Sequence, residues 1–270
     1  MLLSEFDFPF DPALVADRPV LPRHDARLLV MDRSSHARMH RRVADLPSLL
    51  QPGDLIVVNN TKVMPARVPA QTRSTGKILD LLFVQDLGQG LWEVLIKGRF
   101  KPGAFIDFPG GGCGEIVERS QARTTVKVTG VTSVYDLMHN TGTMPLPPYI
   151  KREPSQDDQR WYQTMFAQQE GAIAAPTAGL HFTPELVETL TGKGMELAEV
   201  TLHVGPGTFR SVKSDRIEEH RMLAEQVEVT ARTVEQIRLA QKRGNRVVAV
   251  GTTVVRALET AGRGGRGIQP

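Results

Sequence analysis

The chain has 270 residues, with 33 Lys and Arg against 30 Asp and Glu, a formal net charge of +3 at pH 7. This length is enough to bury a full-sized core in one large domain or two smaller ones, without a disulfide or a metal. Cys113 is the only cysteine, which excludes a disulfide framework and any multi-cysteine metal or iron–sulfur site. No apolar run approaches the ~20 residues of a membrane helix, and the N-terminus has no basic signal-peptide region. We therefore expect a cytoplasmic protein with no membrane partner.

The positive charge is carried mainly by arginine, with 24 Arg and 9 Lys. Because Arg binds phosphates and base edges bidentately, a nucleic-acid partner is one interpretation, and codon bias with solvated Arg–Glu surfaces is the other. Composition leaves both open. The basic residues gather at four places: Arg38, His40, Arg41 and Arg42; Lys151 and Arg152; Arg210, Lys213 and Arg216; and Lys242, Arg243 and Arg246.

The N-terminal part predicts two strands that precede polar residues. A short apolar run at 28–31 predicts a strand, followed by a polar turn and a second short segment. Further on, the turn residues at 52–54 introduce a buried strand at 55–58. That strand ends in Asn59, Asn60 and Thr61, at the carboxyl end where open α/β sheets place their ligands.

The stretch from about residue 67 to 132 has a different texture. Short β-rich runs, separated by Gly, Pro or polar turns and without helical periodicity, predict a small antiparallel barrel or sandwich. The three glycines at 110–112 read as a hairpin loop, because no helix follows them. We expect an inserted β module, a barrel or a sandwich, over 65–145.

After residue 150 strands and helices alternate. Thr183 and Pro184 begin a predicted helix over 184–194, a strand follows at 195–204, and 227–244 runs from a strand into a helix. A buried strand at 246–250 and a helix at 254–261 complete the pattern. The prediction is an α/β domain with a mixed, mainly parallel sheet, made of residues 1–64 and 146–270.

Four segments are candidates for chemistry, and each has a purely structural alternative. Ala174–Thr183 is rich in small residues and leads into a helix N-terminus, where an anion could bind. A tightly packed connection whose histidine is hydrogen-bonded within the protein would give the same sequence pattern. Leu202–Phe209 places a histidine before a Gly-Pro-Gly loop, or is a core histidine beside a turn. Glu218–His220 suits acid–base work, but a solvated helix face is favoured there. Val250–Thr253 is a strand–glycine–hydroxyl–helix junction, a weak sign of a phosphate site.

Together and in order, these segments make the chain resemble a known family. The matching stretches are LLVMDR (28–33), VVNNTKVMPAR (57–67), MPLPPYIKR (144–152), YQTMFA (162–167), AAPTAGLHFT (174–183), TLHVGPGTFR (201–210), EEHRM (218–222) and VVAVGTTVVRALE (247–259). They are similar to the S-adenosylmethionine:tRNA ribosyltransferase-isomerase family of queuosine biosynthesis, over nearly the whole chain.

The resemblance implies a reaction and its partners. The family transfers and isomerises the ribosyl part of S-adenosylmethionine onto 7-aminomethyl-7-deazaguanine at the tRNA wobble position. The product is epoxyqueuosine, with adenine and methionine released. S-adenosylmethionine is then a ribosyl-donor substrate, and no cofactor or metal is permanently bound. The fold implied is an α/β domain with an inserted β-barrel.

The resemblance also implies site residues. A base must remove a proton beside the sulfonium, and the departing adenine needs a proton. The acid–base candidates are His181, His203, Glu219 and His220, without assignment of roles. The substrate-binding candidates are Asn60, Thr61, Arg67, Pro176, Thr177, Gly179, Gly205, Gly207, Thr208, Phe209, Thr252 and Thr253. The candidates for tRNA phosphates are Lys151, Arg152 and Arg210.

The chain departs from the family pattern at several positions. Asn60 stands where relatives usually have Asp, Leu223 where they have His, and Ala26 and Val254 where they have Ser. Relatives also continue past the segment ending at Pro270, so we expect a chain that lacks the family's C-terminal segment. Association with a second copy would cover apolar surface exposed by that loss. The alternative function is a catalytically silent paralogue that keeps S-adenosylmethionine or tRNA binding.

Overall fold

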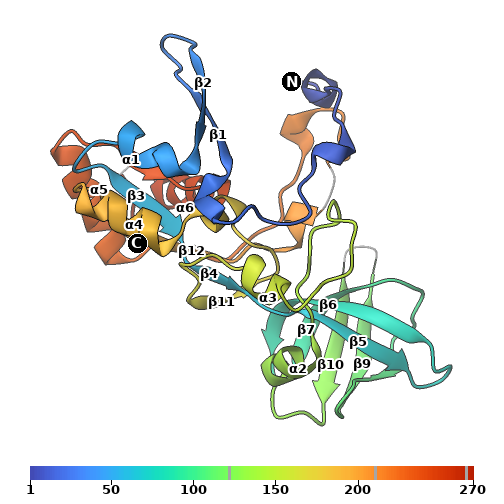
Figure 1. Ribbon diagram of the computed structural model, residues 1–270. Helices are drawn as coiled ribbons and strands as arrows, with labels where there is room; N and C mark the ends of the chain where they lie inside the picture. The colour runs from blue at the N-terminus through green and yellow to red at the C-terminus, as the bar shows by residue number, and fades with distance from the viewer. Residues whose placement is uncertain (121–122, 210–211, 265–266) are drawn as a thin grey trace.

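The computed structural model describes residues 1–120, 123–209, 212–264 and 267–270. A β-barrel occupies one end of the molecule and an α/β layer the other, and a two-stranded hairpin projects beyond the α/β layer (Figure 1). Of the residues described, no helix combines the length and apolar character needed to cross a membrane.

The α/β layer is built on a four-stranded sheet in the order β13–β12–β3–β14. The central strand β3 (Leu55–Asn59) is buried throughout and is parallel to both β12 (Glu196–Leu202) and β14 (Val247–Ala249). The short strand β13 (Val227–Glu228) pairs with β12 in the antiparallel sense. The predicted mixed, mainly parallel sheet is confirmed.

Helices cover both faces of this sheet because the side chains of β3 alternate. Leu55 and Val57 pack in one cluster with α5 (Ala231–Lys242) and α6 (Thr252–Gly262). Ile56 and Val58 pack in the other with α4 (Pro184–Gly192), beside the single turn α1 (Leu46–Leu49). The two-residue period of a strand thus divides the core into two layers.

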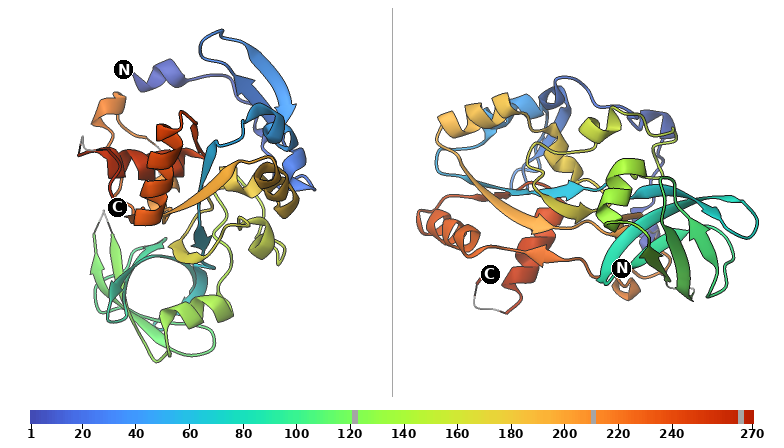
Figure 2. Two further views of the ribbon diagram at one scale, coloured as in Figure 1. Left: turned by 90° about the vertical axis from the view of Figure 1, so that its left-hand side faces the viewer. Right: turned by 90° about the horizontal axis from the view of Figure 1, so that it is seen from below.

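The barrel is closed and antiparallel, in the order β10–β7–β6–β5–β8–β9. Its strands are β5 (Arg67–Thr72), β6 (Ile78–Gly88), β7 (Leu91–Ile96), β8 (Phe105–Asp107), β9 (Cys113–Arg119) and β10 (Thr124–Thr129). Phe83 and Trp92 belong to the barrel core, and residues of α2 (Val134–Thr141) belong to the same cluster. The left view of Figure 2 shows the barrel end-on with α2 beside it. The barrel interpretation is confirmed, and the glycines at 110–112 do form the loop between β8 and β9.

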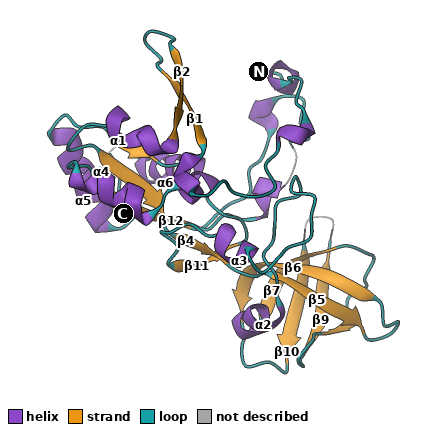
Figure 3. Cartoon of the chain, in the orientation of Figure 1, coloured by secondary structure: helices purple, strands orange, loops and turns teal. Residues whose placement is uncertain are grey.

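A small parallel sheet and several loops connect the two parts. Strand β4 (Thr61–Val63) pairs with β11 (Gln169–Ala172). The helix α3 (Asp158–Trp161) lies in the segment that leads from the barrel back to β11. Figure 3 shows how much of this middle region is loop. The sequence did not predict this sheet, because its strands have only three and four residues.

Two segments leave the body of the molecule. One is the hairpin of β1 (Arg27–Met31) and β2 (Arg38–Arg42). The other is the N-terminus, which pairs through Leu2 with Arg216 (Figure 1). The predicted strand at 246–250 exists as β14, but it is half-buried instead of buried, because β14 pairs only with β3 in the described sheet. The remaining elements are 3₁₀ turns: Leu3–Phe6, Pro12–Leu14, Arg23–Asp25, Val43–Asp45, Thr177–His181, Pro206–Phe209 and Ile217–Glu219.

Candidate active site

A cavity of about 520 Å³ opens at the carboxyl ends of β12 and β14. This is the edge of a parallel sheet at which ligands bind in open α/β folds. Its wall comes from five regions of the chain: Pro147, Pro148 and Tyr149; Tyr162; Ala174–Ala178; Val204 and Thr208; and Gly251–Thr253. The predicted site residues Pro176, Thr177, Thr208, Thr252 and Thr253 are therefore brought together.

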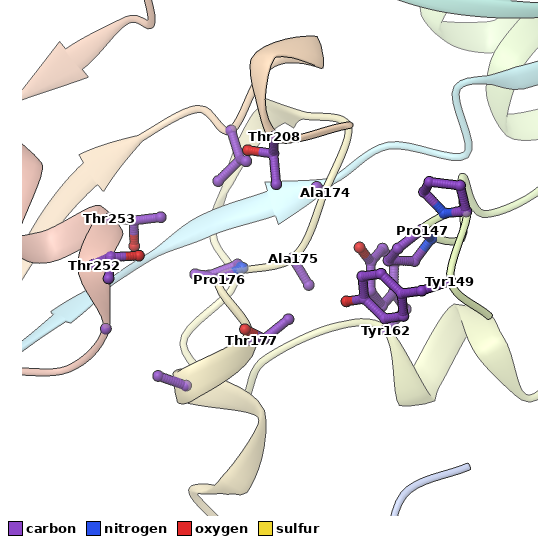
Figure 4. Close-up of a pocket in the computed structure, with 14 residues that line it drawn as sticks. Pro147, Tyr149, Tyr162, Ala174, Ala175, Pro176, Thr177, Thr208, Thr252 and Thr253 are labelled. Atoms are coloured by element: carbon purple, nitrogen blue, oxygen red, sulfur yellow. The ribbon is translucent and has the colours of Figure 1, made fainter. Parts of the chain in front are cut away.

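The lining of the cavity is uncharged. Tyr149 and Tyr162 form one side, and the hydroxyls of Thr252 and Thr253 stand on the other (Figure 4). Burial raises the pKa of both tyrosines, so their hydroxyls stay neutral. Aromatic faces, small residues and a few hydroxyls suit a neutral planar heterocycle better than a phosphate group.

The N-terminus of α6 forms part of this wall. Gly251 precedes the helix with a φ of +90°, a conformation that favours glycine, and a Cβ there would lie 3.0 Å from the Cβ of Ala178. The first N–H groups of the helix have no partner within it, and its dipole is positive at this end. The Thr253 Oγ1 is buried and has no hydrogen-bond partner within the described residues. A ligand carboxylate or ring nitrogen would find donors here.

His181 lies in a second cavity, of about 200 Å³, that shares Tyr149, Tyr162 and Thr177 with the first. His181 is exposed, yet partial burial lowers its pKa and outweighs a hydrogen bond with the Arg23 backbone, with a further contribution from the Arg23 charge. At neutral pH the imidazole is therefore uncharged and able to accept a proton.

His203 precedes Val204 of the cavity wall, is not itself among the residues that line either cavity, and is bonded to β4. Its Nδ1 lies 2.7 Å from the Thr61 Oγ1, and burial lowers its pKa. Gly171 packs against the ring: a Cβ on Gly171 would lie 2.7 Å from the Nδ1, and the φ of Gly171 is +151°. The position of this histidine is thus fixed on two sides.

Asn60 belongs to a buried polar network and not to the described cavity wall. Its Oδ1 accepts a hydrogen bond of 2.7 Å from the Thr201 Oγ1, and its Nδ2 donates one of 3.1 Å to the Glu199 Oε2. The other Glu199 carboxylate oxygen accepts from Gln168. The neutral amide at position 60 therefore matches a carboxylate supplied by β12.

The Gly-Pro-Gly loop packs against the chain that returns to the sheet. The N–H of Gly205 donates to the Glu225 Oε1 at 2.9 Å, and Glu225 also pairs with Arg256. A Cβ on Gly207 would contact Leu223 at 3.6 Å, so Leu223 covers this loop. Gly179 is buried, and a Cβ there would lie 3.1 Å from Thr164.

Glu219 ends the turn Ile217–Glu219, and His220 follows it. This segment lies beside the N-terminus of the chain, because Arg216 pairs with Leu2. In the described part of the chain, neither belongs to the wall of the two cavities. Phe209 has its backbone in the preceding 3₁₀ turn, but its side chain and the whole of Arg210 lie outside the described residues.

Comparison with known proteins gives the family. A family model described as "Queuosine biosynthesis protein" matches residues 3–268. A relative from Citrifermentans bemidjiense, named S-adenosylmethionine:tRNA ribosyltransferase-isomerase, is 42% identical over 98% of this chain and 79% of its own length. One of the same name from Moorella thermoacetica is 45% identical over 96% of this chain and 77% of its own. The chain belongs to the S-adenosylmethionine:tRNA ribosyltransferase-isomerase family.

A solved structure is also similar. The crystal structure of an S-adenosylmethionine tRNA ribosyltransferase from Thermotoga maritima is 32% identical, with a TM-score of 0.46, over 96% of this chain and 73% of that one. The family model and the curated relatives confirm the family resemblance, the enzyme class and the assignment to queuosine biosynthesis.

For a family of tRNA-modifying enzymes, the position of the predicted cations matters. Lys151 is exposed. Arg152 makes two hydrogen bonds of 2.7 Å to the buried Asp158, so its guanidinium has a structural partner. Arg67 pairs with Asp80 on the barrel and is not part of the wall of the 520 Å³ cavity; it lines a groove of about 810 Å³ that shares Pro147 and Pro148 with that cavity.

Sequence reasoning missed several residues of the cavity wall. Pro147, Pro148, Tyr149 and Tyr162 lie in the motifs MPLPPYIKR and YQTMFA, which carried the family resemblance. The charged end of the first motif predicts phosphate contacts, whereas uncharged wall residues carry no comparable signal in a sequence. An aromatic residue beside two prolines in a loop was the available clue.

Proposed function

We propose that this chain transfers and isomerises the ribosyl part of S-adenosylmethionine onto 7-aminomethyl-7-deazaguanine at the wobble position of tRNA. The product would be epoxyqueuosine, and adenine and methionine would leave. The observation that supports this best is the uncharged cavity with tyrosines on one side and the N-terminus of α6 on the other, in a chain of this family.

The cavity suits the two ends of the donor differently. A neutral purine would stack against Tyr149 or Tyr162 and take a hydrogen bond from the Thr253 hydroxyl, which has no partner among the described residues. The methionine carboxylate would be stabilised by the free N–H groups and dipole of α6. Pro176, Thr177, Thr208 and Thr252 shape the space between them.

The reaction needs a base for the proton beside the sulfonium and an acid for the departing adenine. His181 and His203 both have a lowered pKa, so each is neutral and able to accept a proton at pH 7. Glu219 and His220 remain candidates through their place in the family motif. Asn60, Thr61, Arg67, Gly179, Gly205, Gly207 and Phe209 complete the proposed substrate-binding set.

The partners and organisation follow from the same proposal. Lys151, Arg152 and Arg210 would contact tRNA phosphates, and no cofactor would be bound permanently. The enzyme would act in the cytoplasm, where tRNA is found, and self-association would cover exposed apolar surface. We also propose that residues 65–145 form a domain inserted between 1–64 and 146–270.

The test is to incubate the protein with S-adenosylmethionine and tRNA that carries the deazaguanine precursor, and to measure adenine release. Release that depends on both substrates supports the proposal. Calorimetric binding of S-adenosylmethionine without adenine release would support the silent paralogue instead. Failure to bind either substrate would remove both functions.

A further inference from the structure

The hairpin β1–β2 concentrates the positive charge of the protein. Residues 27–42 contain five arginines and one aspartate, a formal charge of +4, against +3 for the whole chain. The other 254 residues together therefore carry a formal charge of −1. The hairpin projects from the body of the molecule in Figure 1 and in the left view of Figure 2. Every residue of β2 is exposed.

Strand pairing places these arginines on both faces of the hairpin. Arg27 is directly opposite Arg42 on one face, and Arg38 follows on that face opposite Met31. Arg41 lies on the other face, opposite Leu28. Arg33 lies in the turn. A partner that touches either face or the tip would meet guanidinium groups.

The folded chain does not neutralise this charge. In the described residues, none of the five guanidinium groups of the hairpin pairs with a carboxylate within 4.0 Å. The only carboxylate of the hairpin, that of Asp32, accepts hydrogen bonds from the N–H groups of Ser34 and Ser35 inside the turn. Like charges opposite each other destabilise a strand pair, so the pattern works against the hairpin's own stability. A polyanionic partner would reverse that effect.

The base of the hairpin is tied to the wall of the candidate active site. Arg23, four residues before β1, donates to the carbonyl oxygen of Gln163 at 2.9 Å and to that of Leu180 at 3.3 Å. His24 bonds the Thr183 hydroxyl at 2.8 Å. Leu180 belongs to the turn Thr177–His181, and Thr177 lines the 520 Å³ cavity. A ligand held by the hairpin would thus lie next to the structure that forms the site.

We propose that the β1–β2 hairpin binds the phosphodiester backbone of the RNA substrate and holds it against the active site. This inference rests on the proposed function, which supplies the RNA. Arg is the residue that pairs phosphate oxygens bidentately, and the spacing of guanidinium groups along a two-stranded ribbon suits a polymer better than a single small anion. Contacts to phosphates would position the tRNA without reading its sequence.

The experiment compares two variants that lose the same charge. R33Q/R38Q/R41Q removes three hairpin cations and leaves Arg42, which bonds the Asp25 carbonyl oxygen. R232Q/R238Q/K242Q removes three exposed cations from α5. Both bring the formal net charge from +3 to zero. Circular dichroism and S-adenosylmethionine binding check that each variant is folded with an intact site.

Binding of tRNA carrying the precursor base is then measured over a range of salt concentrations. Each lost phosphate contact lowers the slope of log K against log salt by about 0.7 to 0.9. We expect the hairpin variant to lose about two units of slope and to bind about ten- to a hundredfold more weakly at low salt. The α5 variant should stay close to the wild type. The KM for tRNA should rise in the hairpin variant, with kcat nearly unchanged at saturation.

Other outcomes would overturn the inference. Equal weakening in the two variants would mean that only net charge matters. Unchanged tRNA binding in the hairpin variant, with loss of binding to phosphatidylserine vesicles, would assign the hairpin to a membrane surface. If the wild type binds tRNA through the hairpin but releases no adenine, the proposed function fails while this inference stands. If adenine is released normally and the hairpin variant binds like the wild type, the inference fails alone.

Discussion

Replacing Asn60 by Asp, the residue that the family resemblance leads us to expect at this position, should destabilise this chain. The Asn60 Nδ2 lies 3.1 Å from the Glu199 Oε2. N60D would put a second carboxylate at that distance, and two charges at 3.1 Å repel by about 5 kcal/mol at an effective dielectric constant of about 20. An Asp carboxyl with an ordinary pKa of about 4 takes up a proton at pH 7 once its pKa has been raised by about three units. At about 1.4 kcal/mol per unit, this limits the cost to about 4 kcal/mol. Glu199 is half-buried, so screening by water brings our expectation to about 2 kcal/mol.

The assay is urea unfolding followed by circular dichroism at pH 8 and pH 5. The repulsion raises the pKa of the carboxyl pair in the folded state, so the variant binds more protons folded than unfolded. Its deficit should therefore be small at pH 5 and grow as the pH rises through the raised pKa. N60D/E199Q should recover most of the loss, because a neutral amide again faces a carboxylate. A variant as stable as the wild type at pH 8, or a deficit that is equal at both pH values and not rescued, would refute the reasoning.

Three further predictions concern the site and its surroundings. R152A should cost about 3–5 kcal/mol of unfolding free energy in urea, because the Asp158 carboxylate is 1% exposed and would lose both bonds; R152A/D158A should recover part of it, and an R152A variant as stable as the wild type would contradict this structural role. T253V should weaken S-adenosylmethionine binding about three- to tenfold in calorimetry with little change in stability, since the hydroxyl has no described protein partner; unchanged affinity would exclude a ligand contact. Because the lowered pKa of His203 means that its folded form resists protonation, stability should fall as the pH drops below about 6.5. In H203N that fall should be shallower in urea titrations between pH 7 and pH 5, and an identical fall would contradict burial of a neutral imidazole.

Regular elements of the fold could be predicted because their patterns are local. The buried run at 55–58, the Thr183 cap and the junction at Gly251 each appear in the structure as β3, the N-cap of α4 and the start of α6. The barrel was predictable from short strands separated by glycine turns, and its closure follows from the pairing of β5 with β8. The strands and turns depend on periodicity and turn chemistry, which neighbouring residues specify, whereas the pairing of Gln71 with Asp107 that helps to close the barrel joins distant residues.

The composition of the site could be predicted only in part, because it depends on contacts between distant residues. The partner of Asn60 is Glu199, and the partner of His203 is Thr61, each about 140 positions away. Tyr162 meets the rest of the cavity wall only through the folding of loops. Arg152 shows the opposite error: a cation that reads as free in the sequence has a buried carboxylate as its partner. Sequence motifs identified the segments that meet, but not which side chains face the cavity.

Isotope transfer to tRNA tests the central claim most directly. S-adenosylmethionine labelled with ¹³C in its ribosyl carbons, and in a second sample only in its methyl group, is incubated with the protein and tRNA carrying 7-aminomethyl-7-deazaguanine. The wobble nucleoside is then examined by mass spectrometry. The proposed function predicts that the five ribosyl carbons appear in the nucleoside, with one adenine released per transfer. Transfer of the methyl label, or of neither label while S-adenosylmethionine and tRNA both bind, would contradict it.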